Sequence, residues 1–274
     1  MSRLKAERQT GFSILELMVA AGLLAVIMLG LLQMFYQTER AFRLGVVQAD
    51  TMEAGRSTIE LITRDFQELT ASGDPMATNL FVQYPRVLFP ITYTSGELRN
   101  NALQPFFLLR RVGGEWRGVR YDFLATNLNA GLGMLHRLEF TMPATNAFEL
   151  STFLEKNNVD ASLPGYGQVA DGIINLTIRA HDVRGNLLYY DNDPAGWNLY
   201  TNLPPDTTTS PFHQYAFRGD DLPAYVEVEL GVLEPKLWER VKAIPNDVAR
   251  MNFLNDRAAN IHYFRQRIPI RSTP

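Results

Sequence analysis

The sequence predicts an α+β protein in which one long N-terminal helix packs on a mainly antiparallel β-sheet head. An apolar run from Phe12 to Leu32 continues, without any proline before Pro75, into a stretch with helical periodicity. The rest of the chain is rich in branched and aromatic segments separated by turn residues. With 274 residues, 46% of them hydrophobic, the chain is long enough for one substantial globular domain and an appended segment.

The N-terminal region combines a basic flank with an apolar run. Residues 1–11 are polar and carry three basic side chains against Glu7, and the run 12–32 is broken only by Ser13 and Glu16. A run of roughly 20 apolar residues can span a membrane, and a basic flank keeps its own end in the cytoplasm. A conventional secretory signal would have a shorter apolar core, followed by a small-residue cleavage site. We therefore expect a membrane span whose C-terminal flank is delivered across the membrane.

Glu16 is an acidic residue in this apolar run. A carboxylate at the centre of a membrane helix costs about 2.5–3.5 kcal/mol, and less toward the interface, so it normally has a partner or a role. If the chain is cut after Gly11, a positive α-amine appears on Phe12, one helical turn from Glu16. The same amine on a neighbouring subunit could pair with this carboxylate. An ordinary signal anchor with a stray interfacial glutamate is the alternative.

The segment from Gly11 to Leu17, Gly-Phe-Ser-Ile-Leu-Glu-Leu, resembles the type IV prepilin, or class III, signal. In that family a prepilin peptidase cleaves after the glycine, the new N-terminal residue is methylated, and a glutamate at the fifth mature position guides assembly. The resemblance implies that Gly11 and Phe12 are processing residues and that Glu16 is an assembly residue. It also implies a pilin-like fold with a leader peptide (1–11), a transmembrane or assembly helix (12–32), an amphipathic helix continuing into the head (33–72) and a β-rich periplasmic head (73–274).

The amphipathic part of the helix is predicted from a stripe of apolar residues at spacings of three and four. The stripe consists of Phe42, Val46, Ala49, Met52, Ile59, Ile62, Phe66 and Leu69. This pattern predicts one helix face that packs on the head. The helix should end before Ser72-Gly73-Asp74-Pro75, which are residues typical of turns.

The head is predicted to consist mostly of strands. We expect strands at 86–94, 106–112, 116–123, 134–142, 173–182, 187–190, 225–230 and 261–270, and short helices at 237–243 and 247–257. Gly113-Gly114 should close a hairpin. The alternation in Tyr225–Leu230 predicts a strand with one wet face, and residues 191–223 should form a long loop.

The order of these elements, with Leu222-Pro223-Ala224-Tyr225-Val226-Glu227-Val228-Glu229-Leu230 before an arginine-bearing last strand, resembles the J-type minor pseudopilins of type II secretion. The related minor pilins of type IV pili share this layout and form the alternative. The segments 143–168 and 191–223 and the insert 235–258 depart from a compact J-type head. The resemblance implies a single-pass protein of the bacterial inner membrane with its C-terminal head in the periplasm. Its implied partners are prepilin peptidase and other minor and major pseudopilins or pilins, with which it would form a tip or initiation complex.

Neither the composition of the chain nor any motif in it indicates catalysis. The formal net charge of −3 leaves no basic excess for nucleic acid, and the chain has no cysteine. The four histidines, at positions 136, 181, 213 and 262, have no second ligand at metal-binding spacing. We therefore expect neither an enzyme nor a cofactor. Asp191-Asn192-Asp193 and Gly219-Asp220-Asp221 could supply oxygen ligands to calcium, as in some pseudopilin heads, but solvated turns are the simpler interpretation. A membrane-anchored periplasmic binding module or enzyme carrying a borrowed leader is the second function class.

Overall fold

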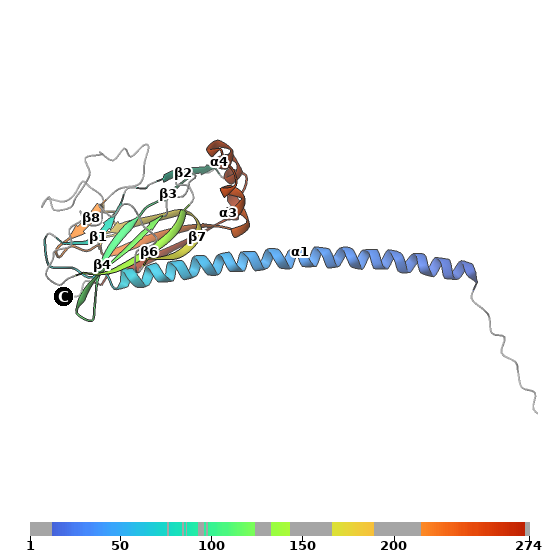
Figure 1. Ribbon diagram of the computed structural model, residues 1–274, viewed down its shortest axis with the longest axis horizontal. Helices are drawn as coiled ribbons and strands as arrows, with labels where there is room; N and C mark the ends of the chain where they lie inside the picture. Colours follow the sequence, from blue (N-terminus) through green and yellow to red (C-terminus); the bar gives the residue numbers. More distant parts are fainter. Residues whose placement is uncertain are drawn as a thin grey trace, which may run out of the picture. The chain divides into compact units, whose positions relative to one another are not determined.

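A computed structural model describes residues 13–75, 77–83, 85, 87–92, 96, 98–123, 133–142, 166–188 and 215–271. The chain divides into two compact units, residues 1–49 and 50–274. The described elements, shown in Figure 1, are α1 (Ile14–Gln67), β1 (Thr78–Val82), β2 (Val87–Thr92), β3 (Leu98–Leu103), β4 (Phe106–Val112), β5 (Glu115–Phe123), β6 (Gly133–Met142), β7 (Tyr166–His181), β8 (Tyr215–Arg218), β9 (Tyr225–Leu233), α3 (Pro235–Lys242), α4 (Asp247–Asn255), the 3₁₀ helix η3 (Ala258–Asn260) and β10 (Ile261–Pro269).

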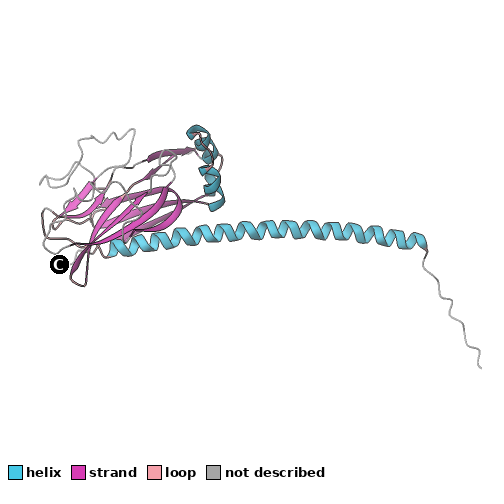
Figure 2. Cartoon of the chain, viewed as in Figure 1, coloured by secondary structure: helices cyan, strands magenta, loops and turns pink. Residues whose placement is uncertain are grey.

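The predicted α+β class is confirmed, because a 54-residue N-terminal helix contacts a mixed, mainly antiparallel sheet (Figure 2). The strand order is β10-β9-β7-β6-β5-β4-β1-β8, and β2 and β3 form an antiparallel pair beside this path. The β3 strand joins β7 in parallel at Leu103 and Leu176, which makes the sheet mixed. Strand β7 therefore lies between β6 and β9 and also contacts β3.

The predicted hairpin at 106–123 is confirmed as β4 and β5. Its turn is Gly113-Gly114, with φ angles of 60° and 90°, between the paired residues Val112 and Glu115. Two consecutive residues with positive φ match the twist of antiparallel strands, and only glycine adopts this conformation without strain.

The C-terminal part of α1 packs on one face of the sheet. Ile59, Ile62 and Phe66 are buried there, and the Phe66 ring stacks on Phe106 with a centroid distance of 5.4 Å. The Phe106 ring in turn stacks on Tyr121 at 4.7 Å. The second half of the predicted stripe is thus confirmed, and Leu69, just after the helix, is also buried.

The first half of the predicted stripe is wrong. Its members Phe42, Val46, Ala49 and Met52 are exposed. The buried positions that precede Ile59 in the helix are instead Thr51, Gly55 and Thr58. Small residues are favoured there because the sheet approaches closely: a Cβ atom on Gly55 would lie 2.1 Å from the Phe264 ring. The helix ends at Gln67, which agrees with the predicted end before Ser72.

Strands β1, β3 and β8 were not predicted from the sequence. Strand β8 lies inside 191–223, so that segment is not a loop throughout. Strand β7 was predicted in part, but it begins at Tyr166, inside the segment 143–168. Strand β1 is buried at every position, so it shows no alternation, and β3 contains Asn100 and Asn101, which are poor strand formers. Of the strand predicted at 187–190, only a bridge at Leu187 is described, and residues 189 and 190 lie outside the described residues.

The predicted wet face of 225–230 is only partly correct. Glu227 is half-buried, but Glu229 is buried because two arginines, Arg99 and Arg265, pair with its carboxylate. The two predicted helices in the insert 235–258 are confirmed as α3 and α4. They bury Leu237, Trp238 and Leu254 in one cluster with residues of β2, β7 and β9.

Candidate assembly site

The first turn of α1 places Glu16 in a reciprocal pair of hydrogen bonds with Ser13. The Ser13 backbone N–H donates to Glu16 Oε2 at 3.0 Å, and the Glu16 backbone N–H donates to Ser13 Oγ at 3.3 Å. This arrangement is a capping box, which satisfies two of the backbone N–H groups that have no partner at a helix start. It also places a carboxylate at the positive end of the helix dipole. The Ser-x-x-Glu spacing of this capping box is visible in the sequence.

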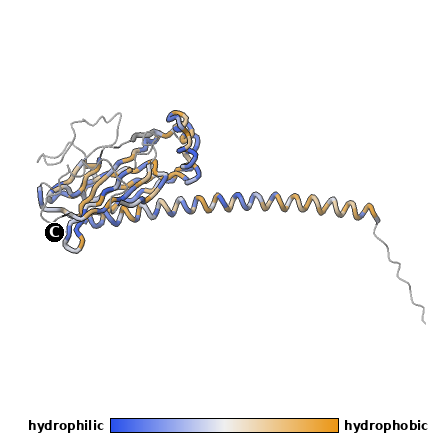
Figure 3. Tube along the Cα trace, viewed as in Figure 1, coloured by the Kyte–Doolittle hydropathy of each residue, from blue (hydrophilic) through white to orange (hydrophobic). Residues whose placement is uncertain are grey.

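The helix that follows is exposed and apolar. Among the described residues, one helix is long and apolar enough to cross a membrane: α1 contains an 18-residue window with a mean hydropathy of 2.5 and none of it buried. Figure 3 shows the hydrophobic colour gathered in the N-terminal part of this helix. Leu15, Leu23 and Leu24 expose 72%, 59% and 61% of their surface, so nothing described in this chain covers them. Their burial requires lipid or other protein chains.

The other two predicted site residues, Gly11 and Phe12, lie outside the described residues. The pairing of a Phe12 amine with Glu16 therefore stays a prediction. The structure adds a second contact, because the carboxylate that should receive the amine also accepts the Ser13 N–H. A carboxylate has two oxygens and about four acceptor positions, so both contacts can be made at once.

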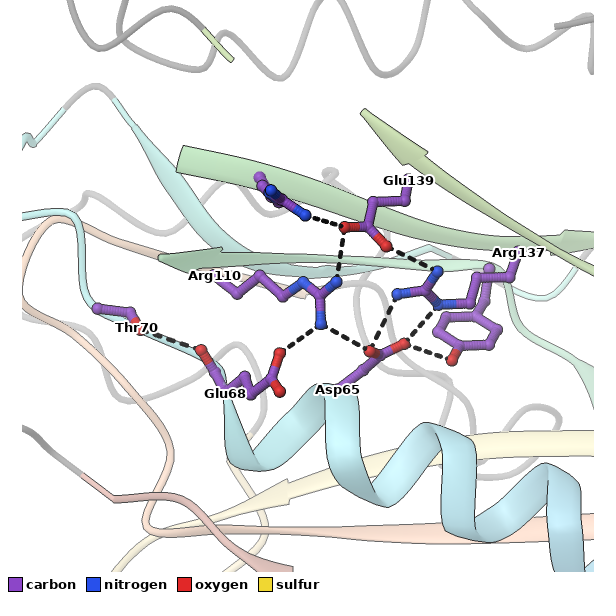
Figure 4. A network of polar contacts seen from close by, with 8 residues as sticks. Asp65, Glu68, Thr70, Arg110, Arg137 and Glu139 are labelled. Carbon is purple, nitrogen blue, oxygen red and sulfur yellow. Dashed lines mark hydrogen bonds and ion pairs between the residues drawn. The ribbon is translucent and has the colours of Figure 1, made fainter. Parts of the chain in front are cut away.

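A second acidic residue of α1 is held quite differently. Asp65, which is completely buried, accepts hydrogen bonds from Arg137 Nε at 2.7 Å and from the Tyr121 hydroxyl at 2.6 Å, and Arg110 Nη1 lies 3.2 Å away (Figure 4). Glu139 joins the two arginines from the far side, at 2.6 Å from Arg110 Nη2 and 2.9 Å from Arg137 Nη1. Glu68 also pairs with Arg110. We call these six residues the Asp65 cluster.

The charges of the Asp65 cluster stabilise one another. Burial disfavours ionisation of Glu139, but hydrogen bonds from Arg110 and Arg137 outweigh it and hold the pKa of Glu139 at about 2. Burial and the adjacent Asp65 carboxylate both raise the pKa of Tyr121, so its hydroxyl stays protonated and donates. Burial would lower the pKa of Arg137, but its bonds to Asp65 raise it instead. The cluster fixes the last turns of α1 on the head and shows no reactive geometry.

Sequence reasoning missed the Asp65 cluster, although a signal was present. Asp65 lies between Ile62 and Phe66 on the apolar face of the predicted helix, and a carboxylate at a core position needs cationic partners. The identity of those partners could not be derived, because Arg110 and Arg137 are remote in the sequence.

The predicted calcium ligands and the histidines do not converge in the described part of the chain. No group of three or more metal-ligating residues occurs among the described residues, where three of the four histidines lie. In the Gly219–Asp221 turn, the carbonyl oxygens of Gly219 and Asp221 accept hydrogen bonds from Asn79 Nδ2 at 2.8 and 3.1 Å. This favours a structural role for that turn. The other candidate, Asp191–Asp193, and His213 lie outside the described residues.

The described part of the head contains a cleft of about 430 Å³ between α1, β7 and α3. Its walls include Thr51 and Ala54 of α1, Trp238 of α3 and the acidic side chains Asp50, Asp171 and Glu239. The volume lies in the usual range of small-ligand sites, about 300–1,000 Å³. Asp171 accepts a hydrogen bond from Gln168, and Glu239 pairs with Lys242, so these two acids already have partners.

No protein-family model matches the chain, and no curated protein sequence matches it. The architecture and the residues of α1 therefore carry the functional argument.

Proposed function

We propose that this protein is a membrane-inserted structural subunit of a pilin-like filament, made as a precursor that is cleaved after Gly11. The observation that carries the proposal is the two-part helix α1. Residues 14–32 expose an apolar surface that contains a single carboxylate, Glu16, and the last turns of the helix are fixed on a β-sheet head. Such a helix can leave the membrane only if other chains cover its apolar surface. No catalysis and no cofactor are part of this proposal.

The narrower proposal is a minor pseudopilin of a type II secretion pseudopilus, in a tip or initiation complex with other minor pseudopilins. The support is the predicted J-type order of elements, together with strand β9, which begins at Tyr225 and pairs along its whole length with the last strand, β10. A minor pilin of a type IV pilus is the alternative. Co-purification of the tagged protein with pseudopilus or with pilus subunits distinguishes the two.

The first test is the N-terminus of the mature protein. We expect intact-mass analysis of protein purified from its native membrane to show loss of residues 1–11 and gain of one methyl group on Phe12. Replacing Gly11 by isoleucine should block this processing, because the peptidase must accommodate the residue before the cut. Purified protein that still begins at Met1 would overturn the proposal.

The second test separates the charge of Glu16 from its capping role. Glu16→Ala removes both, whereas Glu16→Gln keeps an oxygen that can accept the Ser13 N–H but has no charge. If the carboxylate pairs with an amine of another subunit, both variants should enter the membrane normally. The amount of each variant recovered in sheared filaments or tip complexes should fall about tenfold or more. Normal assembly of Glu16→Gln would show that capping alone matters.

The second function class, a membrane-anchored periplasmic binding module, is favoured by the cleft of about 430 Å³. The two classes differ at the N-terminus, since a binding module needs no filament contact and should tolerate Glu16→Ala. A bulky substitution in the cleft, Ala54→Trp, should impair a binding module and leave filament assembly intact.

A further inference from the structure

The sheet face opposite α1 carries an arginine-rich surface over β3, β7, β9 and β10. Side chains alternate along a strand, and Phe264 of β10 packs against α1 at Gly55, so Tyr263 and Arg265 project from the other face. Arg265 contacts Glu229 and Glu227 of β9, which places these side chains on the same face. We call this surface the arginine face; it comprises Arg99, Arg179, Tyr225, Tyr263, Arg265 and Arg267.

Two aromatic rings hold two of these arginines in place. The guanidinium carbon of Arg99 lies 3.5 Å from the centroid of the Tyr263 ring, and that of Arg267 lies 3.5 Å from the centroid of the Tyr225 ring. His181 stacks on Tyr225 at 4.5 Å and supports it. A stacked guanidinium has lost rotamer freedom before any ligand arrives, and its planar N–H fork matches a carboxylate.

The arginine face has an excess of positive charge. Its four arginines surround two glutamates, which leaves a formal excess of two positive charges among these six side chains. Glu229 pairs with Arg99 at 2.7 Å and with Arg265 at 2.6 Å, while Glu227 lies 3.1 Å from Arg265 and 4.0 Å from Arg179. Burial disfavours ionisation of Glu229, but hydrogen bonds from Arg99 and Arg265 lower its pKa, so the pair stays ionic. Since the whole chain is acidic, with a net charge of −3, this local excess is distinctive.

The same surface borders a sheet edge. Strand β10 ends the strand order, and among the described residues it pairs with β9 alone. An edge strand presents backbone N–H and C=O groups to which another strand can add. Arg265, Gln266 and Arg267 are exposed in the middle of β10. Cationic side chains there disfavour pairing with a neutral or basic strand and favour an acidic one.

The register of the charges also favours an extended occupant. Across β10 and β9, Arg265 is opposite Glu229 and Arg267 is opposite Glu227, so the exposed cations recur every second residue. Side chains of an extended strand recur with the same period on one face. The headgroups of an anionic membrane have no such two-residue period.

We propose that the arginine face and the β10 edge form a docking surface for an extended acidic segment of a partner protein. Carboxylates of that segment pair with the arginines of the face, and its backbone adds to β10. This inference goes beyond the filament function and does not depend on cleavage after Gly11.

The test measures binding of a labelled peptide to the full-length protein in detergent by fluorescence anisotropy. The probe is a nine-residue peptide of alternating glutamate and threonine, and the comparison peptide has lysine in place of glutamate. We expect the glutamate peptide to bind and the lysine peptide not to bind. Neutralising Arg265→Gln together with Arg267→Gln should weaken binding of the glutamate peptide about tenfold to a hundredfold.

Three controls make the result decisive. Arg240→Gln removes an exposed arginine of α3 that is not one of the residues of the arginine face, and it should leave binding unchanged. Arg267→Glu should lose the glutamate peptide and gain the lysine peptide, which a merely unfolded variant cannot do. Equal binding of the two peptides, or unchanged affinity in the double variant, would overturn the proposal. Stronger binding to phosphatidylglycerol than to phosphatidylcholine vesicles would do the same and would indicate a membrane surface, provided that the double variant loses this difference and the glutamate peptide does not compete for it.

Discussion

Residues 14–49 of α1 expose their apolar side chains, whereas residues 50–67 of the same helix bury one face on the sheet. One acidic residue in each stretch shows the same difference. Glu16 is exposed and, among the described residues, contacts only its neighbour Ser13, whereas Asp65 is bonded by two arginines and a tyrosine from remote strands. In the second stretch, the apolar face and the Asp65 carboxylate find their partners within the same chain. In the first stretch, the apolar side chains and the remaining acceptor positions of Glu16 need lipid or another protein chain as a partner.

The largest expected effect comes from removing the buried acid. Asp65→Ala leaves Arg110, Arg137 and Tyr121 without their shared acceptor, and breaking a buried ion pair typically costs about 3–5 kcal/mol. We expect a loss of this size in the free energy of unfolding. Urea denaturation in detergent, monitored by tryptophan fluorescence, measures it. Glu60→Ala, which removes an exposed helical pair with Arg56, should cost about 0.5 kcal/mol or less. Equal losses in the two variants would contradict the distinction drawn between buried and exposed acids.

Acid should weaken the Asp65 cluster through Glu139. Its folded-state pKa of about 2 lies below its ordinary value of 4.5, so its stabilising contribution is complete above about pH 4.5 and is lost as the pH falls toward 2. A shift of this size corresponds to a contribution on the order of 2–3 kcal/mol. Unfolding free energies measured across this range should fall with pH. In Glu139→Gln the fall should be smaller and stability near neutral pH lower; an unchanged pH profile in that variant would remove the role assigned to Glu139.

The smallest effect compares two glycines of α1 directly. A Cβ atom at Gly55 would lie 2.1 Å from the Phe264 ring, whereas a Cβ atom at Gly45 would meet nothing within 4 Å. Gly55→Ala should therefore cost about 1–3 kcal/mol through overpacking, although alanine is the better helix former. Gly45→Ala should leave the head's unfolding free energy unchanged. Thermal melts of the two variants, recorded side by side, measure the difference, and similar melting temperatures would show that Phe264 moves aside at little cost.

Much of the architecture could be predicted, because local patterns specify it. The apolar run of α1, the Gly-Gly hairpin between β4 and β5 and the alternation at Tyr225–Leu230 each have a period or a turn signal that depends on neighbouring residues only. The missed strands lack such signals. Strand β1 is buried on both faces, and β8 has four residues and owes its strand conformation to pairing with β1.

The candidate site could be predicted only in part, for a related reason. The predicted role of Glu16 came from a local motif, and the Ser13 cap could have been added from the same spacing. The exposed stripe at Phe42, Val46 and Met52 was wrongly expected to pack on the head, because periodicity identifies an apolar face without identifying what covers it. The partners of Asp65 and Glu229 come from other strands, so their ion pairs depend on tertiary structure that a single sequence does not encode locally.

The Asp65 cluster also has a consequence for the order in which the chain matures. Asp65 is separated from Arg110 by 45 residues and from Arg137 by 72, so its carboxylate stays hydrated during synthesis until both arginines have emerged. The central strand β7 completes its antiparallel pairing only with β9, later still. Contacts of such long range slow folding. The head must therefore acquire its native packing after nearly the whole polypeptide has been made.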